Sequence, residues 1–120
     1  MENHRLVLPE HLNHYGFLFG GHLLKLVDEF AYIAATMEYP GCNFVTIGMD
    51  SVEFKKSVCQ GTILKFIVEK THEGTTSLQY LVHVYRSNNL EENNFIFSTR
   101  VTFVRVDEQG KKIPLQKVRG

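Results

Sequence analysis

The pattern of apolar and polar positions changes period once along the chain. Residues 22–39 contain no glycine or proline, are rich in leucine and alanine, and are followed by Pro40 and Gly41. This stretch predicts one long helix of about 27 Å, at about 1.5 Å per residue. After Gly41, apolar and polar residues alternate, as in β-strands. Strands are predicted at residues 3–8, 45–50, 63–71, 76–86 and 95–106.

The strands are separated by short turn signals at Gly61, Glu73-Gly74 and Ser87-Asn88-Asn89. Such connections favour antiparallel pairing. A helix that is apolar on nearly all sides must be buried on several of them. The expected fold is therefore α+β, with one long central helix wrapped by a curved, mostly antiparallel sheet. Alternation also predicts one shared face in the last strand for Phe95, Phe97, Val101 and Phe103.

The 120 residues fit one domain, with a core at about residues 5–107 and a basic tail at 108–120. Hydrophobic residues make up 43% and charged residues 22%, as in ordinary globular proteins. The tail charges are either solvated or a small phosphate-attracting patch. These charges belong to Lys111, Lys112, Lys117 and Arg119.

Composition also limits the partners and the compartment. The formal net charge of zero argues against nucleic acid, and no apolar run is long enough to make a membrane a partner. The first fifteen residues lack a signal-peptide pattern, so we expect a cytoplasmic protein with reduced Cys42 and Cys59. The histidines form no zinc-binding pattern with acids or cysteines, so no metal is expected.

Asp28 is the unusual residue of the predicted helix. At 100° per residue, an exposed stripe contains His22, Lys25, Glu29 and Thr36. Asp28 lies outside this stripe, at the margin of the apolar face, where acids are rarely buried without a partner. The alternative to a functional role is a surface ion pair with Lys25, three residues away. The neighbours of Asp28 on the wheel are Leu24, Ala31, Tyr32 and Ala35.

The loop before the helix contains Asn13 and ends in Gly20-Gly21. Glycines at a helix start allow close approach to the backbone, and the first N–H groups of a helix have no partner within it. Such groups suit the oxyanion of a tetrahedral intermediate. The alternative is an ordinary glycine turn before a helix.

The run from Leu8 to Ala35 resembles the acyl-CoA hydrolase group of hotdog thioesterases, and weaker similarity extends from Arg5 to Asp107. Two positions depart from the family pattern near the expected CoA entrance, where this chain has Ser57 and Thr62. The matching blocks are Leu8-Pro9-Glu10, Asn13-His14-Tyr15-Gly16, Phe19-Gly20-Gly21, Asp28-Glu29, Val45-Thr46, Val52-Glu53-Phe54-Lys55, Gly61, Gly74-Thr75-Thr76-Ser77-Leu78, Ser98-Thr99 and Thr102-Phe103-Val104.

The resemblance implies a hotdog fold and a homodimer with sheets joined edge to edge, often assembled further as three dimers. It also implies an active site at the dimer interface, with Asn13 from one subunit and Asp28 from the other. The substrate would be a fatty acyl-CoA, hydrolysed to free acid and CoA without a separate cofactor. The sequence separation of Asn13 and Asp28 by itself fits a site within one chain or between two.

In this reaction Asp28 would act as general base or as nucleophile, and Asn13 would orient water or the thioester. The backbone at Gly20 and Gly21 would hold the oxyanion. The acyl chain would lie along the alanine side of the helix. The alternatives are a hotdog hydratase, for which His22 is the only candidate, and a non-catalytic acyl-CoA binder.

The phosphates of CoA require basic or N–H-rich groups. The candidates are Lys55, Lys56, Thr75, Thr76 and Ser77. A solvated strand end explains the two lysines equally well, and a hairpin turn explains the residues after Gly74.

Overall fold

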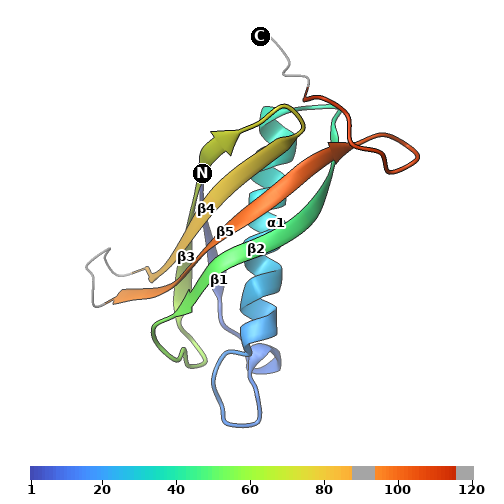
Figure 1. Ribbon diagram of the computed structural model, residues 1–120. Coiled ribbons are helices and arrows are strands. Elements are labelled where there is room, and N and C mark those ends of the chain that lie inside the picture. Colours follow the sequence, from blue (N-terminus) through green and yellow to red (C-terminus); the bar gives the residue numbers. More distant parts are fainter. Residues whose placement is uncertain (88–93, 116–120) are drawn as a thin grey trace.

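A computed structural model describes residues 1–87 and 94–115. It confirms the order of one strand, one long helix and four strands (Figure 1). A short 3₁₀ helix, which the sequence did not predict, is added between the first strand and the long helix. Asn88 and Asn89 of the last predicted turn lie outside the described residues. The elements are β1 (Glu2–Leu6), η1 (Pro9–His11), α1 (Gly20–Glu38), β2 (Asn43–Phe54), β3 (Ile63–Glu73), β4 (Ser77–Arg86) and β5 (Phe95–Val106).

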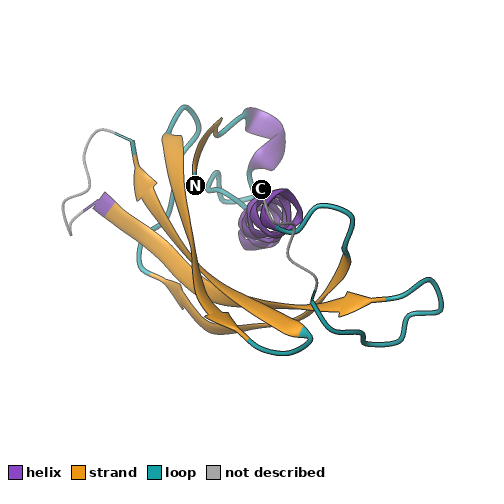
Figure 2. Ribbon diagram, turned by 90° about the horizontal axis from the view of Figure 1, so that it is seen from above, coloured by secondary structure: helices purple, strands orange, loops and turns teal. Residues whose placement is uncertain are grey.

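The strands form one antiparallel sheet in the order β1-β3-β4-β5-β2. The sheet curves around α1, which lies on its concave face (Figure 2). The alternation predicted for β3 and β4 is confirmed, because Leu64, Phe66 and Val68 are buried, as are the matching residues of β4. Within the described residues, no helix is both long and apolar enough to cross a membrane.

Helix α1 begins two residues earlier than predicted, so Gly20 and Gly21 form its first turn. The preceding residue, Phe19, is extended and provides no side-chain cap. The predicted start at residue 22 was placed after the last glycine. Glycine is nevertheless permitted in a first helical turn, because the N–H groups there make no hydrogen bonds within the helix. The helix start therefore exposes glycine backbone.

Irregularities in strand pairing change the face of several residues. Phe95 was predicted to share the inner face with Phe97, which is wrong. The register shifts between the pairs Val84–Phe97 and Tyr85–Phe95. The Phe95 ring consequently packs against Tyr85, with ring centroids 5.5 Å apart, and against His83 at 5.8 Å. An extra residue in one strand reverses the alternation beyond it, and local sequence does not reveal where this happens.

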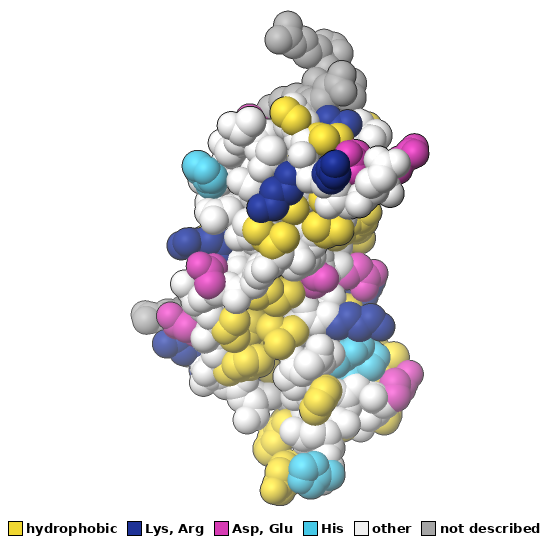
Figure 3. All heavy atoms as spheres, turned by 45° about the vertical axis from the view of Figure 1, so that its right-hand side comes forward, with side chains coloured by type: hydrophobic (Ala, Val, Ile, Leu, Met, Phe, Trp, Pro, Cys, Tyr) yellow, Lys and Arg dark blue, Asp and Glu magenta, His cyan; other side chains and the backbone are white. Residues whose placement is uncertain are grey.

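Strand β2 forms an exposed edge of the sheet. Its apolar residues Val45 and Ile47 are 45% and 55% exposed, whereas Phe44 is buried. Tyr32 on the neighbouring side of α1 is also exposed. Figure 3 shows hydrophobic side chains gathered in a band on this side of the molecule. A long edge strand with exposed apolar residues invites pairing with another strand.

The chain after β5 folds back against the domain as far as the described residues extend. The Ile113 N–H donates to the Arg105 carbonyl at 3.0 Å, and the Leu115 N–H donates to the Thr75 carbonyl at 2.9 Å. Leu115 also packs against the core. Residues 108–115 are thus attached to β5 and to the β3–β4 turn. Lys117 and Arg119 of the predicted basic tail lie outside the described residues.

Candidate active site

The Asp28 side chain lies midway along α1, half-buried and close to β2. Its Oδ1 accepts a hydrogen bond of 2.6 Å from the Thr46 hydroxyl. Among the described residues, no ion pair includes Asp28, so the surface pair with Lys25 is not formed. Its second carboxylate oxygen has no hydrogen-bond partner in this part of the chain. A carboxylate held in this way keeps one oxygen available for chemistry.

The surroundings of Asp28 confirm its predicted position at the edge of the buried face. Ala31 and Ala35 are completely buried, whereas Tyr32 is 40% exposed. The buried alanines contradict the expected path of the acyl chain along that side, because the protein's own sheet already covers it. Thr36 departs from the predicted exposed stripe, since it is half-buried with a shielded hydroxyl.

Asn13 organises the loop before α1. Its Oδ1 accepts the N–H groups of Tyr15 at 2.9 Å and Phe17 at 3.2 Å. Gly16 lies inside this turn with a φ of 85°, a conformation that favours glycine. Because the Oδ1 oxygen already accepts these two N–H groups, the Nδ2 amide group is the part of the Asn13 side chain left for a ligand or a water molecule, to which it would donate.

A cleft of about 460 Å³ brings several predicted site residues together. Asn13 and Gly20 line it, together with Lys55 and Lys56. The Gly20 and Gly21 N–H groups have no acceptor within the described residues. A side chain at Gly20 would reach van der Waals contact with the Phe54 ring, at 3.5 Å. The start of α1 therefore has unpaired backbone donors, and the cleft beside it is lined by two basic residues, a combination that suits an anionic or developing negative charge.

The two lysines occupy the segment after β2. Lys55 forms an exposed ion pair with Glu53 at 3.0 Å, and its backbone N–H donates to the Ile96 carbonyl at 2.8 Å. The backbone of this segment is thus tied to β5, while both lysine side chains are exposed. An exposed ion pair of this kind is weak and can be exchanged for a phosphate.

One protomer does not bring the whole predicted site together. Asp28 is eight residues along α1 from Gly20, about 12 Å at the helical rise, and it does not line the cleft. The turn at Thr75, Thr76 and Ser77 lies at the other end of the molecule, beside the last residues of α1 (Figure 1). The predicted residues thus form three separate groups, at the start, middle and end of the helix.

His22 is half-buried and stacks on His11, with ring centroids 4.0 Å apart. Burial, and next the neighbouring His11, lower the pKa of His22. Its ring is thus engaged with another histidine at the start of α1, and it does not line the cleft. This position gives no support to a hydratase based on His22.

Thr46 is the site residue that sequence reasoning missed. It appeared only as part of a matching block, without a role. Its hydrogen bond to Asp28 joins residues eighteen positions apart in sequence, on β2 and α1. The available signal was a polar residue among apolar ones in β2, on the same face as buried Phe44.

The thioesterase superfamily model matches residues 15–92. The uncharacterized acyl-CoA thioester hydrolase YkhA of Bacillus subtilis is 32% identical over 93% of this chain and 65% of its own length. This chain thus spans just under two thirds of that relative. A hexameric acyl-CoA thioesterase of known structure is 36% identical, with a TM-score of 0.83 over 99% of this chain and 76% of that one.

An acyl-CoA hydrolase from Staphylococcus aureus was solved with CoA as an asparagine-to-alanine variant. It is 30% identical, with a TM-score of 0.85 over 99% of this chain and 71% of that one. An aspartate-to-alanine variant of the same enzyme has also been solved. The matched residues and the shared architecture confirm the resemblance noted at Leu8 to Ala35. The chain belongs to the thioesterase superfamily and has its hotdog fold.

Proposed function

We propose that this protein hydrolyses fatty acyl-CoA thioesters to the free acid and CoA. The observation that carries the proposal is the Asp28 carboxylate, half-buried, oriented by the Thr46 hydroxyl and without a basic partner in the described chain. Partial burial of a carboxylate without a cationic partner costs stability, and groups of this kind are concentrated at functional sites. The names of the similar hydrolases support the same reaction.

In the proposed reaction a C–O bond forms at the thioester carbonyl and the C–S bond breaks. As general base, Asp28 would take a proton from water, and that proton would reach the departing CoA sulfur. As nucleophile, Asp28 would form an anhydride that water then cleaves. The unpaired N–H groups of Gly20 and Gly21 suit the oxyanion of either path.

A homodimer joined through β2 would complete the site. The exposed edge and its apolar residues Val45 and Ile47 support this arrangement. Twofold antiparallel pairing of two β2 edges places the start of one helix near the end of the other. The cleft of one protomer would then approach Asp28 of its partner. In the staphylococcal enzyme the two substituted residues are fifteen positions apart, the same separation as Asn13 and Asp28.

The same pairing would gather the predicted CoA contacts. Lys55 and Lys56 lie at the cleft, and the turn at Thr75–Ser77 lies at the opposite end of the protomer. An antiparallel dimer would bring the turn of one protomer toward the lysines of the other. We further propose assembly as a trimer of dimers, since the similar thioesterase is hexameric.

We place the protein in the cytoplasm. Cys42 is buried, Cys59 is exposed, and no disulfide joins them. Two thiols that the fold leaves unbridged are typical of a reducing compartment.

Mixing two inactive variants tests both the reaction and the shared site. Asn13→Ala and Asp28→Ala homodimers should each release little thiol from acyl-CoA. After subunit exchange, half of the dimers should be mixed, each with one intact site, giving about one quarter of wild-type activity. No recovery despite demonstrated exchange would place both residues in one chain. Wild-type protein that binds acyl-CoA tightly without releasing thiol would instead be an acyl-CoA binder.

A further inference from the structure

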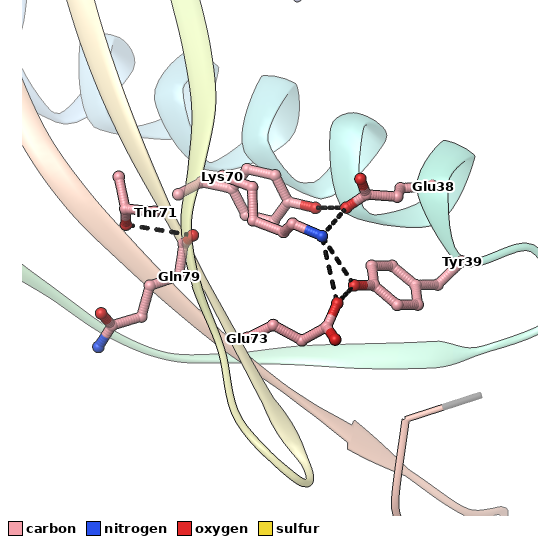
Figure 4. A network of polar contacts seen from close by, with 7 residues as sticks. Glu38, Tyr39, Lys70, Thr71, Glu73 and Gln79 are labelled. Carbon is pink, nitrogen blue, oxygen red and sulfur yellow. Dashed lines mark hydrogen bonds and ion pairs between the residues drawn. The ribbon is translucent and has the colours of Figure 1, made fainter. Parts of the chain in front are cut away.

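A polar cluster closes the end of α1 that lies farthest from the cleft (Figure 4). Its hub is Lys70 of β3, whose Nζ lies 2.9 Å from Glu38 Oε1 and 3.2 Å from Glu73 Oε1. The same ammonium group donates to the Tyr39 hydroxyl at 3.0 Å. We call this cluster the helix-end clamp; it consists of Glu38, Tyr39, Lys70, Glu73 and Tyr80.

The two phenols complete the hydrogen bonding of the clamp. Tyr39 donates to Glu73, and Tyr80 donates to Glu38 Oε1 at 3.3 Å. Both rings are buried, so their hydroxyl groups are held in place by core packing. Burial, followed by the charge of Glu38, raises the pKa of Tyr80, which therefore remains a protonated donor. Each donor in the clamp thus meets a fixed acceptor, which makes the cluster rigid.

A bulge in β3 creates the clamp. Residues three apart in a regular strand point to opposite faces, so Lys70 and Glu73 should not both face α1. The pairing with β4 shifts between Lys70 and His72, which leaves Thr71 as an extra residue. The bulge therefore turns Glu73 toward the helix, and bulges commonly redirect side chains in this way. Lys70 and Glu73 can therefore face α1 together because the bulge lies between them.

The clamp stands directly at the base of the β3–β4 turn. Glu73 is the last residue of β3, and the Gly74 N–H donates to the Ser77 carbonyl at 2.8 Å to close the turn. The opposite side of the turn is held by the Arg105 N–H, which donates to the Thr76 carbonyl at 2.9 Å. The turn is thus attached to the end of α1 through Glu73 and to β5 through Arg105.

We propose that the helix-end clamp positions the Thr75–Ser77 turn relative to the helix that carries Asp28, and thereby sets the affinity for the CoA part of the substrate. This inference rests on the proposed function, in which that turn contacts CoA. Lys70 touches neither the reacting atoms nor the cleft, so it acts as a positioning residue. Its removal should weaken CoA binding and leave the chemical step intact.

The charge balance explains why Lys70 is decisive. The clamp contains two carboxylates and one ammonium group; Lys70 and Glu38 are half-buried, whereas Glu73 is exposed. Without the ammonium group, the like charges of Glu38 and Glu73 would face each other with only the hydroxyl groups of Tyr80 and Tyr39 as donors. Their repulsion would push the end of β3, and the turn beyond it, away from α1.

Titration of CoA into the Lys70→Met variant tests the proposal. We expect the Kd for CoA and the KM for acyl-CoA to rise about tenfold, while kcat changes less than about twofold. The matched control is Lys65→Met, which removes an ion pair with Glu2 at 3.3 Å on the same strand but away from the turn. A lower Tm with unchanged Kd would show a merely structural role and overturn the proposal, as would an equal rise in the control.

A double-mutant cycle shows whether Lys70→Met changes the Kd for CoA by displacing the Thr75–Ser77 turn. Lys70→Met is combined with Thr76→Ala; non-additive changes in the Kd for CoA support the proposal, and additive changes overturn it. If Lys70→Met does not fold, Tyr80→Phe removes one hydroxyl of the clamp and replaces it in the cycle. The Kd measurements use binding alone, whereas the proposed hydrolysis is judged by thiol release from the wild type. The two ideas can therefore fail separately.

Discussion

The two ends of α1 differ in whether their polar groups have hydrogen-bond partners. At the start, the Gly20 and Gly21 N–H groups have no acceptor in the described chain, and Gly20 lines a cleft. At the end, Lys70 brings two carboxylates and a phenol into one closed cluster. Unpaired donors cost stability and are retained where a ligand can use them, whereas paired groups hold structure. This difference is consistent with the proposals made above, in which the start of the helix takes part in the reaction and its end holds the β3–β4 turn in place.

The largest expected effect comes from Asp28, between the two ends. Asp28→Ala should lower kcat by about 10²- to 10⁴-fold, the usual contribution of a general base, with an unchanged circular dichroism spectrum. Thiol release from acyl-CoA measures the effect. Glu29→Ala, at the exposed neighbouring position, is the matched control and should keep full activity. Near-native turnover of the Asp28 variant would remove the catalytic assignment.

Asn13→Asp should separate the two roles of Asn13, which are to accept hydrogen bonds within the loop before α1 and to donate one to the substrate or water. It keeps the oxygen that accepts the Tyr15 and Phe17 N–H groups, but it loses the amide donor. We expect a fall in kcat of about 10-fold or more, with Tm nearly unchanged. Asn13→Ala should lose both activity and about 1–2 kcal/mol of stability, because two hydrogen bonds disappear. Equal activity of Asn13→Asp and wild type would contradict a donor role.

At the closed end, Tyr39→Phe should affect stability instead of turnover. The hydroxyl that links Lys70 and Glu73 is removed while the buried ring remains. The free energy of unfolding should fall by about 1–3 kcal/mol, as for a buried group left without its partner. Urea denaturation measures this change, and kcat at saturating substrate should stay within about twofold. A large loss of kcat would contradict the assignment of the end of α1 to positioning alone.

The smallest effect is expected from the exposed lysines of the cleft. A Lys55→Ala/Lys56→Ala double variant should weaken CoA binding several-fold at low salt, and the difference should shrink as ionic strength rises. Isothermal titration at two salt concentrations checks this. Lys65→Ala is the control on another strand. An unchanged affinity for CoA at low salt would show that both lysines are solvated residues at a strand end and do not contact CoA.

Local pattern was enough to predict the helix, the strands and the unusual place of Asp28. Each of these depends on neighbouring residues, through the periods of 3.6 and two. The wrong placement of Phe95 shows the limit of this reasoning, because one shift in pairing with β4 reverses the face of the residues beyond it. The same limit hid the clamp, which needs the bulge at Thr71.

The sequence by itself determined the elements, their order and the side chains proposed to react, since periodicity and residue chemistry are local properties. The tertiary structure decided which oxygen of Asp28 is held by Thr46, which alanines are covered, and which apolar residues of β2 remain exposed. Those outcomes depend on sheet register and curvature. Strand pairing between distant residues sets both, and no stretch of neighbouring residues encodes them.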